Sequence, residues 1–219
     1  MIRKLLSLVV IAVLLSACSS YSKRSTNKLS TDKLSVQISE HHAFKLLSPK
    51  SLNKQLSLTQ LVEIRFNNQN HELMMQIEIS VDKIVVVGLS AEGARLFSLI
   101  YDGNSIINDG YSDIIKSLKA EYLLADLQLS LWPFDSVNAQ FQRTNQCEKV
   151  VKSNNTSTCE VRESDDHLNR QVLVNNEVLV NIDYQNETHY KGALTIVNKQ
   201  RGYQLTITSL QVIELESPS

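Results

Sequence analysis

Residues 55–82, QLSLTQLVEIRFNNQNHELMMQIEISVD, carry the clearest structural signal in the chain. Apolar and polar side chains alternate in both halves of this stretch, which puts them on opposite faces of a β-strand. An Asn-rich turn at residues 67–70 separates the halves, so we expect a hairpin with one dry face and one wet face. Each arm would extend about 35 Å. Strands of that length favour a strongly curved sheet or a barrel over a small sandwich.

Other segments repeat this alternation or are apolar throughout. Residues 84–89, IVVVGL, are apolar in both phases, so we expect both faces of that strand to be covered. Asp102-Gly103 is a hairpin turn signal, and Asn175-Asn176 precedes another alternating run. The apolar phase of the last strand slips near Ser209-Leu210, which predicts a β-bulge. The sequence therefore predicts about nine to eleven antiparallel strands.

The period changes to that of a helix in the middle of the chain. Ser112-Asp113 suits a helix N-cap, and apolar residues then fall on one helical face as far as Trp132. Residues 126–131 also alternate like a strand, so the helix could instead stop near Ala125. Pro133 ends the segment in either case. The predicted fold class is mainly β, an antiparallel half-barrel with one central helical lid.

The N-terminus has the layout of a bacterial lipoprotein signal. A short basic region and an apolar run lead to Leu15-Ser16-Ala17-Cys18, so residues 1–17 form the predicted signal peptide. The apolar run is about half the roughly 20 residues that a spanning helix needs. Cys18 becomes the acylated N-terminus, and Ser19 resembles the sorting signal for the outer membrane, facing the periplasm. We expect a flexible tether over 18–40 and a single domain over 41–219.

Charge and cysteine content narrow the range of partners. The formal net charge is −1, and removal of the signal peptide takes away Arg3 and Lys4 and leaves about −3, which argues against nucleic acid as a partner. Cys147 and Cys159 flank a polar loop, and a disulfide across it would contribute about 3 kcal/mol. Two unpaired thiols are the alternative. A redox-active pair is not favoured because the chain has no Cys-x-x-Cys spacing.

Sequence motifs for catalysis are missing from the chain. It has no Gly-rich phosphate loop, no Gly-x-Ser-x-Gly elbow and no His-Glu-x-x-His helix. Ser90 lies between glycines but at the wrong spacing for a nucleophile. His41 and His42 are adjacent, and neighbouring side chains on a strand point to opposite faces, so no metal site is expected. We therefore expect no cofactor, no metal and no enzymatic activity.

A half-barrel encloses a volume that either its own side chains or a ligand must fill. In one hypothesis the central helix covers an apolar cavity that accepts acyl chains or another hydrophobic ligand. The candidate lining residues are Val85, Val87, Leu89, Phe97, Leu123, Leu127, Trp132 and Phe134. In the other hypothesis these residues only form the core, and the protein is a structural lipoprotein that recruits a partner complex.

Residues 84–103, IVVVGLSAEGARLFSLIYDG, together with Leu131-Trp132-Pro133, resemble a family of proteobacterial outer-membrane lipoproteins. Genes of that family often accompany aryl-polyene biosynthesis genes, and the family in turn resembles LolA and LolB. The resemblance implies an incomplete barrel with a helical lid over a lipid-binding cavity. It also implies a lipid or aryl-polyene-like ligand, delivery to the outer membrane, and a LolA-like periplasmic carrier as a partner.

Overall fold

The computed structural model describes residues 27–29, 34–39, 42–110, 119–143, 159–164, 168–186 and 188–215. Within these ranges the chain forms thirteen strands, two α-helices and one short 3₁₀ helix. In chain order they are β1 (Asn27–Leu29), β2 (Ser35–Ser39), β3 (His42–Lys45), η2 (Pro49–Leu52), β4 (Gln55–Phe66), β5 (Gln69–Ile79), β6 (Ile84–Leu89), β7 (Arg95–Tyr101), β8 (Ile106–Gly110), α3 (Ala120–Leu131), α4 (Phe134–Arg143), β9 (Cys159–Ser164), β10 (Asn169–Val174), β11 (Glu177–Tyr184), β12 (Ala193–Asn198) and β13 (Tyr203–Leu215).

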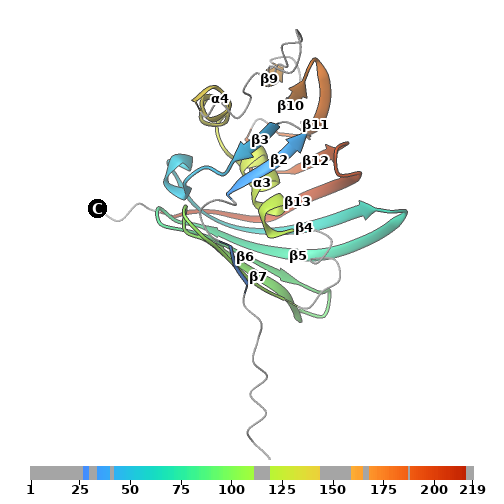
Figure 1. Ribbon diagram of the computed structural model, residues 1–219. Helices are drawn as coiled ribbons and strands as arrows, with labels where there is room; N and C mark the ends of the chain where they lie inside the picture. Colours follow the sequence, from blue (N-terminus) through green and yellow to red (C-terminus); the bar gives the residue numbers. More distant parts are fainter. Residues whose placement is uncertain are drawn as a thin grey trace, which may run out of the picture.

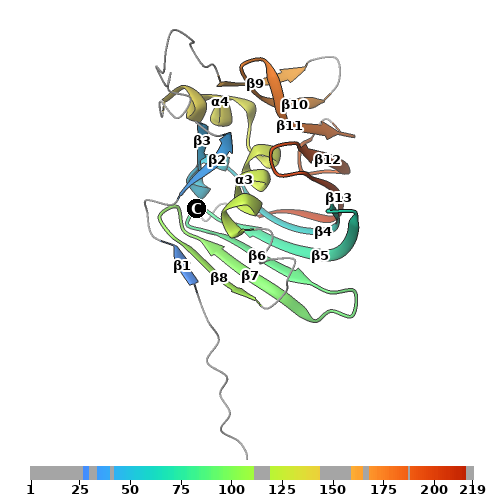
Figure 2. The same cartoon turned by 45° about the vertical axis from the view of Figure 1, so that its right-hand side comes forward.

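Eleven of the described strands form one sheet in the order β1-β8-β7-β6-β5-β4-β13-β12-β11-β10-β9, and every neighbouring pair is antiparallel. The sheet is two meanders joined where β13 pairs with β4. It is open, because β1 and β9 lie at its two edges. It curves around α3, with β5 to β8 on one side of the helix and β9 to β12 on the other (Figure 2). The predicted mainly-β antiparallel half-barrel is confirmed.

The long hairpin of β4 and β5 is the centre of this sheet, as the alternation predicted. Its turn places Asn67 and Asn68 at φ values of 48° and 59°. A tight hairpin turn of this kind needs two residues at positive φ, and Asn tolerates that conformation better than most side chains. The same solution recurs at Asn175 and Asn176. The bulge predicted near Ser209-Leu210 is confirmed, since the register between β13 and β4 shifts between residues 209 and 211.

The central segment forms two helices rather than one. α3 runs without interruption to Leu131, so the alternative in which residues 126–131 form a strand is wrong. The predicted N-cap at Ser112-Asp113 lies outside the described residues. The chain then breaks at Trp132-Pro133, and α4, which the sequence reading did not predict, follows directly. Pro133 cannot continue the hydrogen bonding of the first helix but is well tolerated at the start of the second.

The predicted tether over 18–40 extends too far toward the C-terminus. β1 pairs with β8 at the edge of the large sheet, and β2 pairs with β3 in a separate two-stranded sheet. Leu34, Val36 and Ile38 expose only 4%, 1% and 2% of their surface. Residues 34–39, LSVQIS, alternate like a strand, but the run is short and follows a polar stretch, so the sequence analysis included it in the tether. The domain therefore begins well before residue 41; the signal peptide and Cys18 lie outside the described residues.

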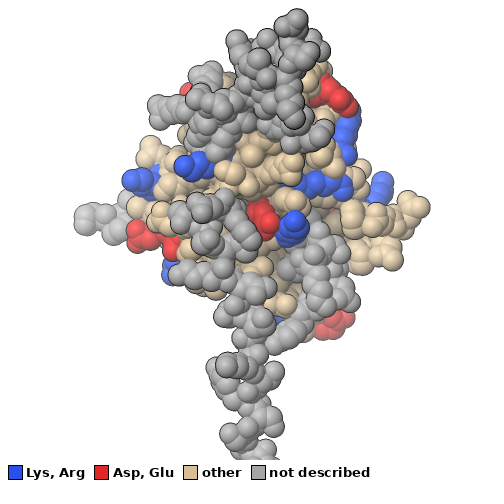
Figure 3. Space-filling model, viewed as in Figure 1, with Lys and Arg blue, Asp and Glu red and all other residues tan. Residues whose placement is uncertain are grey.

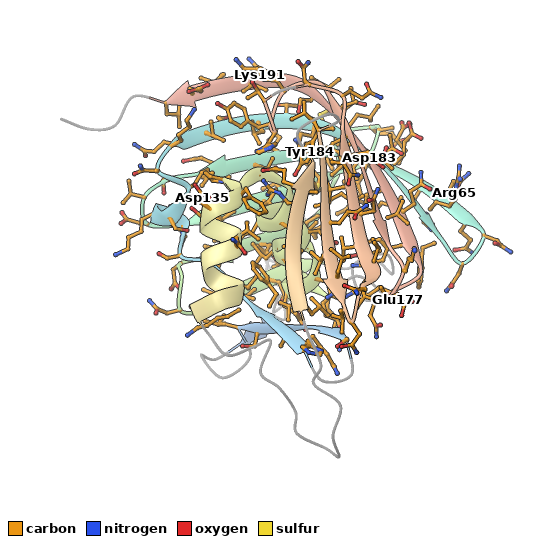
Figure 4. All side chains as sticks on the ribbon, turned by 90° about the horizontal axis from the view of Figure 1, so that it is seen from above. Arg65, Asp135, Glu177, Asp183, Tyr184 and Lys191 are labelled. Carbon is orange, nitrogen blue, oxygen red and sulfur yellow. The ribbon has the colours of Figure 1, made fainter. Side chains whose placement is uncertain are left out.

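α3 lies between the two sheets. The β2–β3 ribbon is on one side of it, and the strands around β4, β13 and β12 are on the other (Figure 1). Arg65 marks the far end of the β4–β5 hairpin, which projects beyond the neighbouring strands (Figure 4). This arrangement presents one face of α3 to the concave side of the large sheet. The candidate functional site lies between these two surfaces.

Candidate ligand-binding cavity

A narrow apolar cavity separates α3 from the concave face of the large sheet. The volume of the cavity that is open to the centre of a water molecule is about 30 Å³. The total empty space, which includes the region where the cavity opens to solvent, is about 580 Å³. The first volume is room for one or two water molecules. In this conformation α3 therefore nearly closes the cavity. Its lining residues are Gln60, Val62, Ile64, Leu73, Met75, Phe97, Leu123, Asp126, Leu127, Ser130, Leu131, Leu194, Ile196, Leu205 and Ile207.

Three of the predicted cavity residues line this space. Leu123 and Leu127 reach it from α3, and Phe97 reaches it from β7. The spacing of the α3 contribution, at positions 123, 126, 127, 130 and 131, is that of one helical face. Leu123 and Leu127 therefore lie on the face of α3 that is turned to the cavity.

The predictions for β6 were wrong because they used the wrong face of the strand. Ile84 and Val86 are fully buried on the concave side, whereas Val85, Val87 and Leu89 alternate with them and are only half-buried. A strand that is apolar in both phases does not show in its sequence which face is turned inward.

Trp132 and Phe134 also lie outside the cavity lining. Trp132 is fully buried at the break between the two helices, where its Nε1–H donates a 2.8 Å hydrogen bond to Ser51 Oγ. Phe134 begins α4 and packs at the margin of the core. Cys147 lies outside the described residues, and so does the side chain of Cys159, so the disulfide stays a prediction.

Two glycines give Phe97 its place in the cavity wall. Gly88 and Gly110 are its partners on the neighbouring strands β6 and β8. A Cβ atom on Gly88 would lie 2.0 Å from Phe97 Cε1, and one on Gly110 would lie 2.6 Å from Phe97 Cβ. Since no such contact is sterically possible, the aromatic ring can occupy this site only because both neighbours lack side chains.

The C-terminal end of α3 is held by a buried arginine. Arg170, on β10, is fully buried, and its Nη1 donates hydrogen bonds to Leu129 O at 2.6 Å and Trp132 O at 2.8 Å. These carbonyls belong to the last turn of the helix, which has no partner for them within the helix. Arg170 Nη2 also donates to Glu163 Oε1 at 2.9 Å. The guanidinium thus donates hydrogen bonds to the free carbonyls at the end of the helix and also neutralises the Glu163 carboxylate.

Two further side chains hold the same half of α3. Gln128 forms a reciprocal pair with the backbone of Leu47, since its Oε1 accepts from Leu47 N and its Nε2 donates to Leu47 O, both at 2.7 Å. Tyr184, labelled in Figure 4, donates from its hydroxyl to Ser130 O at 2.9 Å. Burial raises the pKa of this phenol, so it stays neutral and remains a donor.

The middle of α3 is held by a charged network instead. Asp126 exposes 1% of its surface, and its Oδ2 accepts a hydrogen bond from the Tyr203 hydroxyl. Arg201 Nη1 lies 3.7 Å from Asp126 Oδ1, which is an ion pair but too long for a hydrogen bond. The Arg201 guanidinium stacks on the Tyr122 ring at 3.9 Å and donates to Gln37 O at 2.9 Å. This group, Asp126, Arg201, Tyr203 and Tyr122, is called the Asp126 network below.

Burial is the main influence on the acid of this network. It raises the pKa of Asp126 from its ordinary 3.8 to about 6, against the lowering effects of Arg201, Tyr203 and Asn198. Asp126 is therefore mostly ionised at neutral pH, but at a cost. Its Oδ1 atom is buried and has no hydrogen-bond partner among the described residues. An acceptor of this kind is rare in a folded protein and calls for a structural or functional explanation.

The polar members of the cavity wall, Gln60, Asp126 and Ser130, were missed by the sequence analysis. A signal for them exists in the pattern. Gln60 interrupts the apolar phase of β4, and Asp126 and Ser130 fall on the same helical face as Leu123 and Leu127. Ser130 is already satisfied, because its hydroxyl donates to Leu127 O at 3.1 Å. Asp126 is the polar group whose bonding is incomplete.

Charged side chains on the face shown in Figure 3 are interspersed, with Lys and Arg beside Asp and Glu. Among the described residues, no helix is both long enough and apolar enough to span a membrane. No group of three potential metal ligands gathers within the same ranges.

The fold and the cavity together define a half-barrel whose concave face is covered by a helix and lined by apolar side chains. By sequence, the chain belongs to the family described as "Protein of unknown function (DUF3261)", whose model matches residues 57–211. No curated protein matches the chain in sequence. The association with aryl-polyene genes stays a prediction.

Solved structures give distant similarities. An outer membrane lipoprotein-sorting protein domain from Vibrio parahaemolyticus is 9% identical, with a TM-score of 0.40 over 76% of this chain and 87% of that one. A LolA superfamily protein from Nitrosomonas europaea is 9% identical, with a TM-score of 0.39 over 78% and 91%. A DUF1329 family protein from Desulfovibrio piger is 8% identical, with a TM-score of 0.37 over 78% and 90%. No inference about ligand or partner follows from likeness at this level.

Proposed function

We propose that this protein is a lipid-anchored, non-catalytic binding protein that takes an apolar chain into the cavity under α3. The observation that carries the proposal is the lining of that cavity. Twelve of its fifteen residues are apolar, and the three polar ones are Gln60, Asp126 and Ser130. A space of this composition favours acyl or polyene chains, because each methylene that leaves water contributes about 0.8 kcal/mol.

Binding requires α3 to move, since the closed cavity is too small for a chain. The contacts of the helix suggest how. Its C-terminal half is held by hydrogen bonds that involve Arg170, Gln128 and Tyr184. Its middle is held by the Asp126 network, and Tyr122 and Leu123 in the N-terminal half are only half-buried. Opening by a tilt of the N-terminal half breaks fewer bonds than lifting the whole helix.

The predicted lipobox supports a place for this activity. Acylation of Cys18 would hold the domain at the outer membrane, facing the periplasm, where a chain could pass from the cavity to the bilayer. In this proposal the ligand is a lipid or an aryl-polyene-like molecule, and a LolA-like carrier supplies it. No bond is made or broken, so the proposal assigns no enzymatic role.

The test compares two variants that each add one carboxylate. Leu127→Glu puts a charge on a cavity-lining residue that exposes 7% of its surface, and Val81→Glu puts one on a side chain that exposes 51%. Binding of a hydrophobic fluorophore, and its displacement by a fatty acid, would be measured on the purified mature chain. We expect saturable binding by the wild type and by Val81→Glu, and loss of binding in Leu127→Glu.

Native mass spectrometry of the protein from a host that carries the lipid pathway would identify the ligand. A discrete additional mass that organic solvent releases is the expected result. Folded wild-type protein that binds neither the fluorophore nor a host lipid extract would overturn the proposal and favour the scaffold hypothesis. Circular dichroism checks that each variant is folded.

A further inference from the structure

Asp126 lines the apolar cavity and has one carboxylate oxygen without a hydrogen-bond partner among the described residues. Asp126 comes from α3, between the lining residues Leu123 and Leu127, and its side chain is 1% exposed. Its Oδ2 atom is satisfied by Tyr203, whereas its Oδ1 has no hydrogen-bond partner among the described residues. We propose that Asp126 Oδ1 is the polar anchor of the ligand site and accepts a hydrogen bond from the head of a neutral, donor-bearing amphiphile. This inference rests on the proposed function and specifies its ligand class.

The neighbours of Asp126 show why the donor should come from a ligand rather than from the protein. Arg201 is the nearest cation, but its guanidinium is committed to Gln37 O, to the Tyr203 oxygen and to the face of the Tyr122 ring. Asn198 donates to the Tyr203 oxygen at 3.4 Å. Tyr203 holds Oδ2, whereas Arg201 Nη1 lies 3.7 Å from Oδ1, which is beyond hydrogen-bond length. Oδ1 therefore keeps an acceptor position that none of the described residues fills, in a residue that lines an otherwise apolar cavity.

Charge balance selects a neutral head. Asp126 is a buried acid and Arg201 a half-buried base, and they already form an ion pair 3.7 Å apart. A ligand cation or anion would add an uncompensated charge to a space with little water, which costs several kcal/mol. A hydroxyl or an amide N–H instead completes the bonding of Oδ1 without changing the net charge. The ligand class is therefore an acyl or polyene chain with a hydroxyl or amide near the end that enters the cavity.

The experiment uses four ligands with the same chain: lauryl alcohol, dodecane, dodecylammonium and laurate. Each displaces a bound naphthylamine fluorophore from the mature chain, and the affinities are compared between the wild type and Asp126→Leu. The variant should bind lauryl alcohol about ten-fold more weakly, the loss expected for a hydrogen bond to a charged acceptor. Its affinity for dodecane should stay within about three-fold of the wild type, because dodecane cannot use the acceptor.

Two further variants keep the test decisive. Asp82→Leu makes the same change at an exposed residue that does not line the cavity, so all four affinities should be unchanged. Asp126→Asn keeps an acceptor oxygen and serves if Asp126→Leu fails to fold. It should lose part of the preference for the alcohol, by a few-fold.

The outcomes separate the two proposals. If all four ligands bind and Asp126→Leu leaves the ratio of alcohol to dodecane affinity unchanged, the anchor is wrong while the binding function stands. If laurate or dodecylammonium depends on Asp126 more than the alcohol does, the neutral head is wrong. If none of the four ligands binds folded wild-type protein, the binding function fails as well.

Discussion

Replacement of Arg170 by Met tests whether the buried guanidinium holds α3 in place. Met retains most of the apolar length of the side chain but removes the hydrogen bonds to Leu129 O and Trp132 O. Hydrogen bonds to charged groups contribute about 1.5–3 kcal/mol each, and breaking a buried charged pair costs about 3–5 kcal/mol. Arg170 Nε is itself buried without a partner among the described residues, and its removal offsets part of the loss. We therefore expect the free energy of unfolding to fall by about 3 kcal/mol.

The assay is urea unfolding followed by the fluorescence of Trp132, which is the single tryptophan of the chain and is fully buried beside this contact. Arg95→Met is the matched control. Arg95 pairs with Asp109 at 3.1 Å, but its side chain is 33% exposed, so its loss should cost less than about 1 kcal/mol. A change in Arg170→Met no larger than in Arg95→Met would refute the assignment of Arg170 as the anchor of the helix.

The same variant has a second readout at His189. Burial, and then the charge of Arg170, lower the pKa of this histidine, whereas Glu163, 3.2 Å away, raises it. Removal of the guanidinium takes away a repulsive charge and leaves the attractive one. The pKa of His189 should therefore rise, which an NMR titration measures directly. A pKa that stays the same in folded Arg170→Met would show that the guanidinium and the imidazole are not electrostatically linked.

Two other predictions concern the cavity wall. Gly88→Ala should destabilise the protein by about 1–3 kcal/mol, since the new methyl group overlaps the Phe97 ring. In a Phe97→Ala background the same change should cost almost nothing. An equal cost in both backgrounds would contradict this account. Asp126 has a pKa of about 6 in the folded protein and 3.8 as its ordinary value, so its favourable contribution is present below the lower pKa and is lost as the pH rises through the higher one. The stability of Asp126→Asn relative to the wild type, measured by urea unfolding at several pH values, should therefore rise by about 2 kcal/mol between about pH 4 and pH 7, and a pH-independent difference would contradict the raised pKa.

Local patterns predicted the parts of the fold in which one face of a strand is wet. In the β4–β5 hairpin, a shift of one residue would turn the entire apolar set to solvent, so alternation fixes both the strand and its inner face. In β6 the same reasoning failed, because Val85 and Val87 are as apolar as Ile84 and Val86, and only the neighbouring strands decide which pair is buried. Strand β2 was missed for another reason. Residues 34–39, LSVQIS, alternate between apolar and polar, but this short run follows a polar stretch and was included in the predicted tether.

The residues of the candidate site also differ in how well the sequence predicted them. Leu123 and Leu127 were candidates from the sequence, and both lie on the cavity face of α3. Asp126 lies on the same face, but its role depends on Tyr203 and Arg201, which follow it by more than seventy residues in the chain. A charged residue on an apolar helical face is a sequence signal for a buried polar site. This signal does not identify the partners of Asp126, so it does not show that one carboxylate oxygen is hydrogen-bonded and the other is not.

The two halves of α3 are held by different chemistry, and this difference connects binding to opening. Arg170, Gln128 and Tyr184 hydrogen-bond to backbone groups at the C-terminal end of the helix, and none of the three lines the cavity, so a ligand there does not meet them. The Asp126 network is incomplete, and its acid is ionised at a cost that burial imposes. A tilt that lets a chain enter weakens the contact of Asp126 with Tyr203. A donor on the ligand would restore a hydrogen bond to the same carboxylate, so the proposed anchor would offset part of the free energy that opening requires.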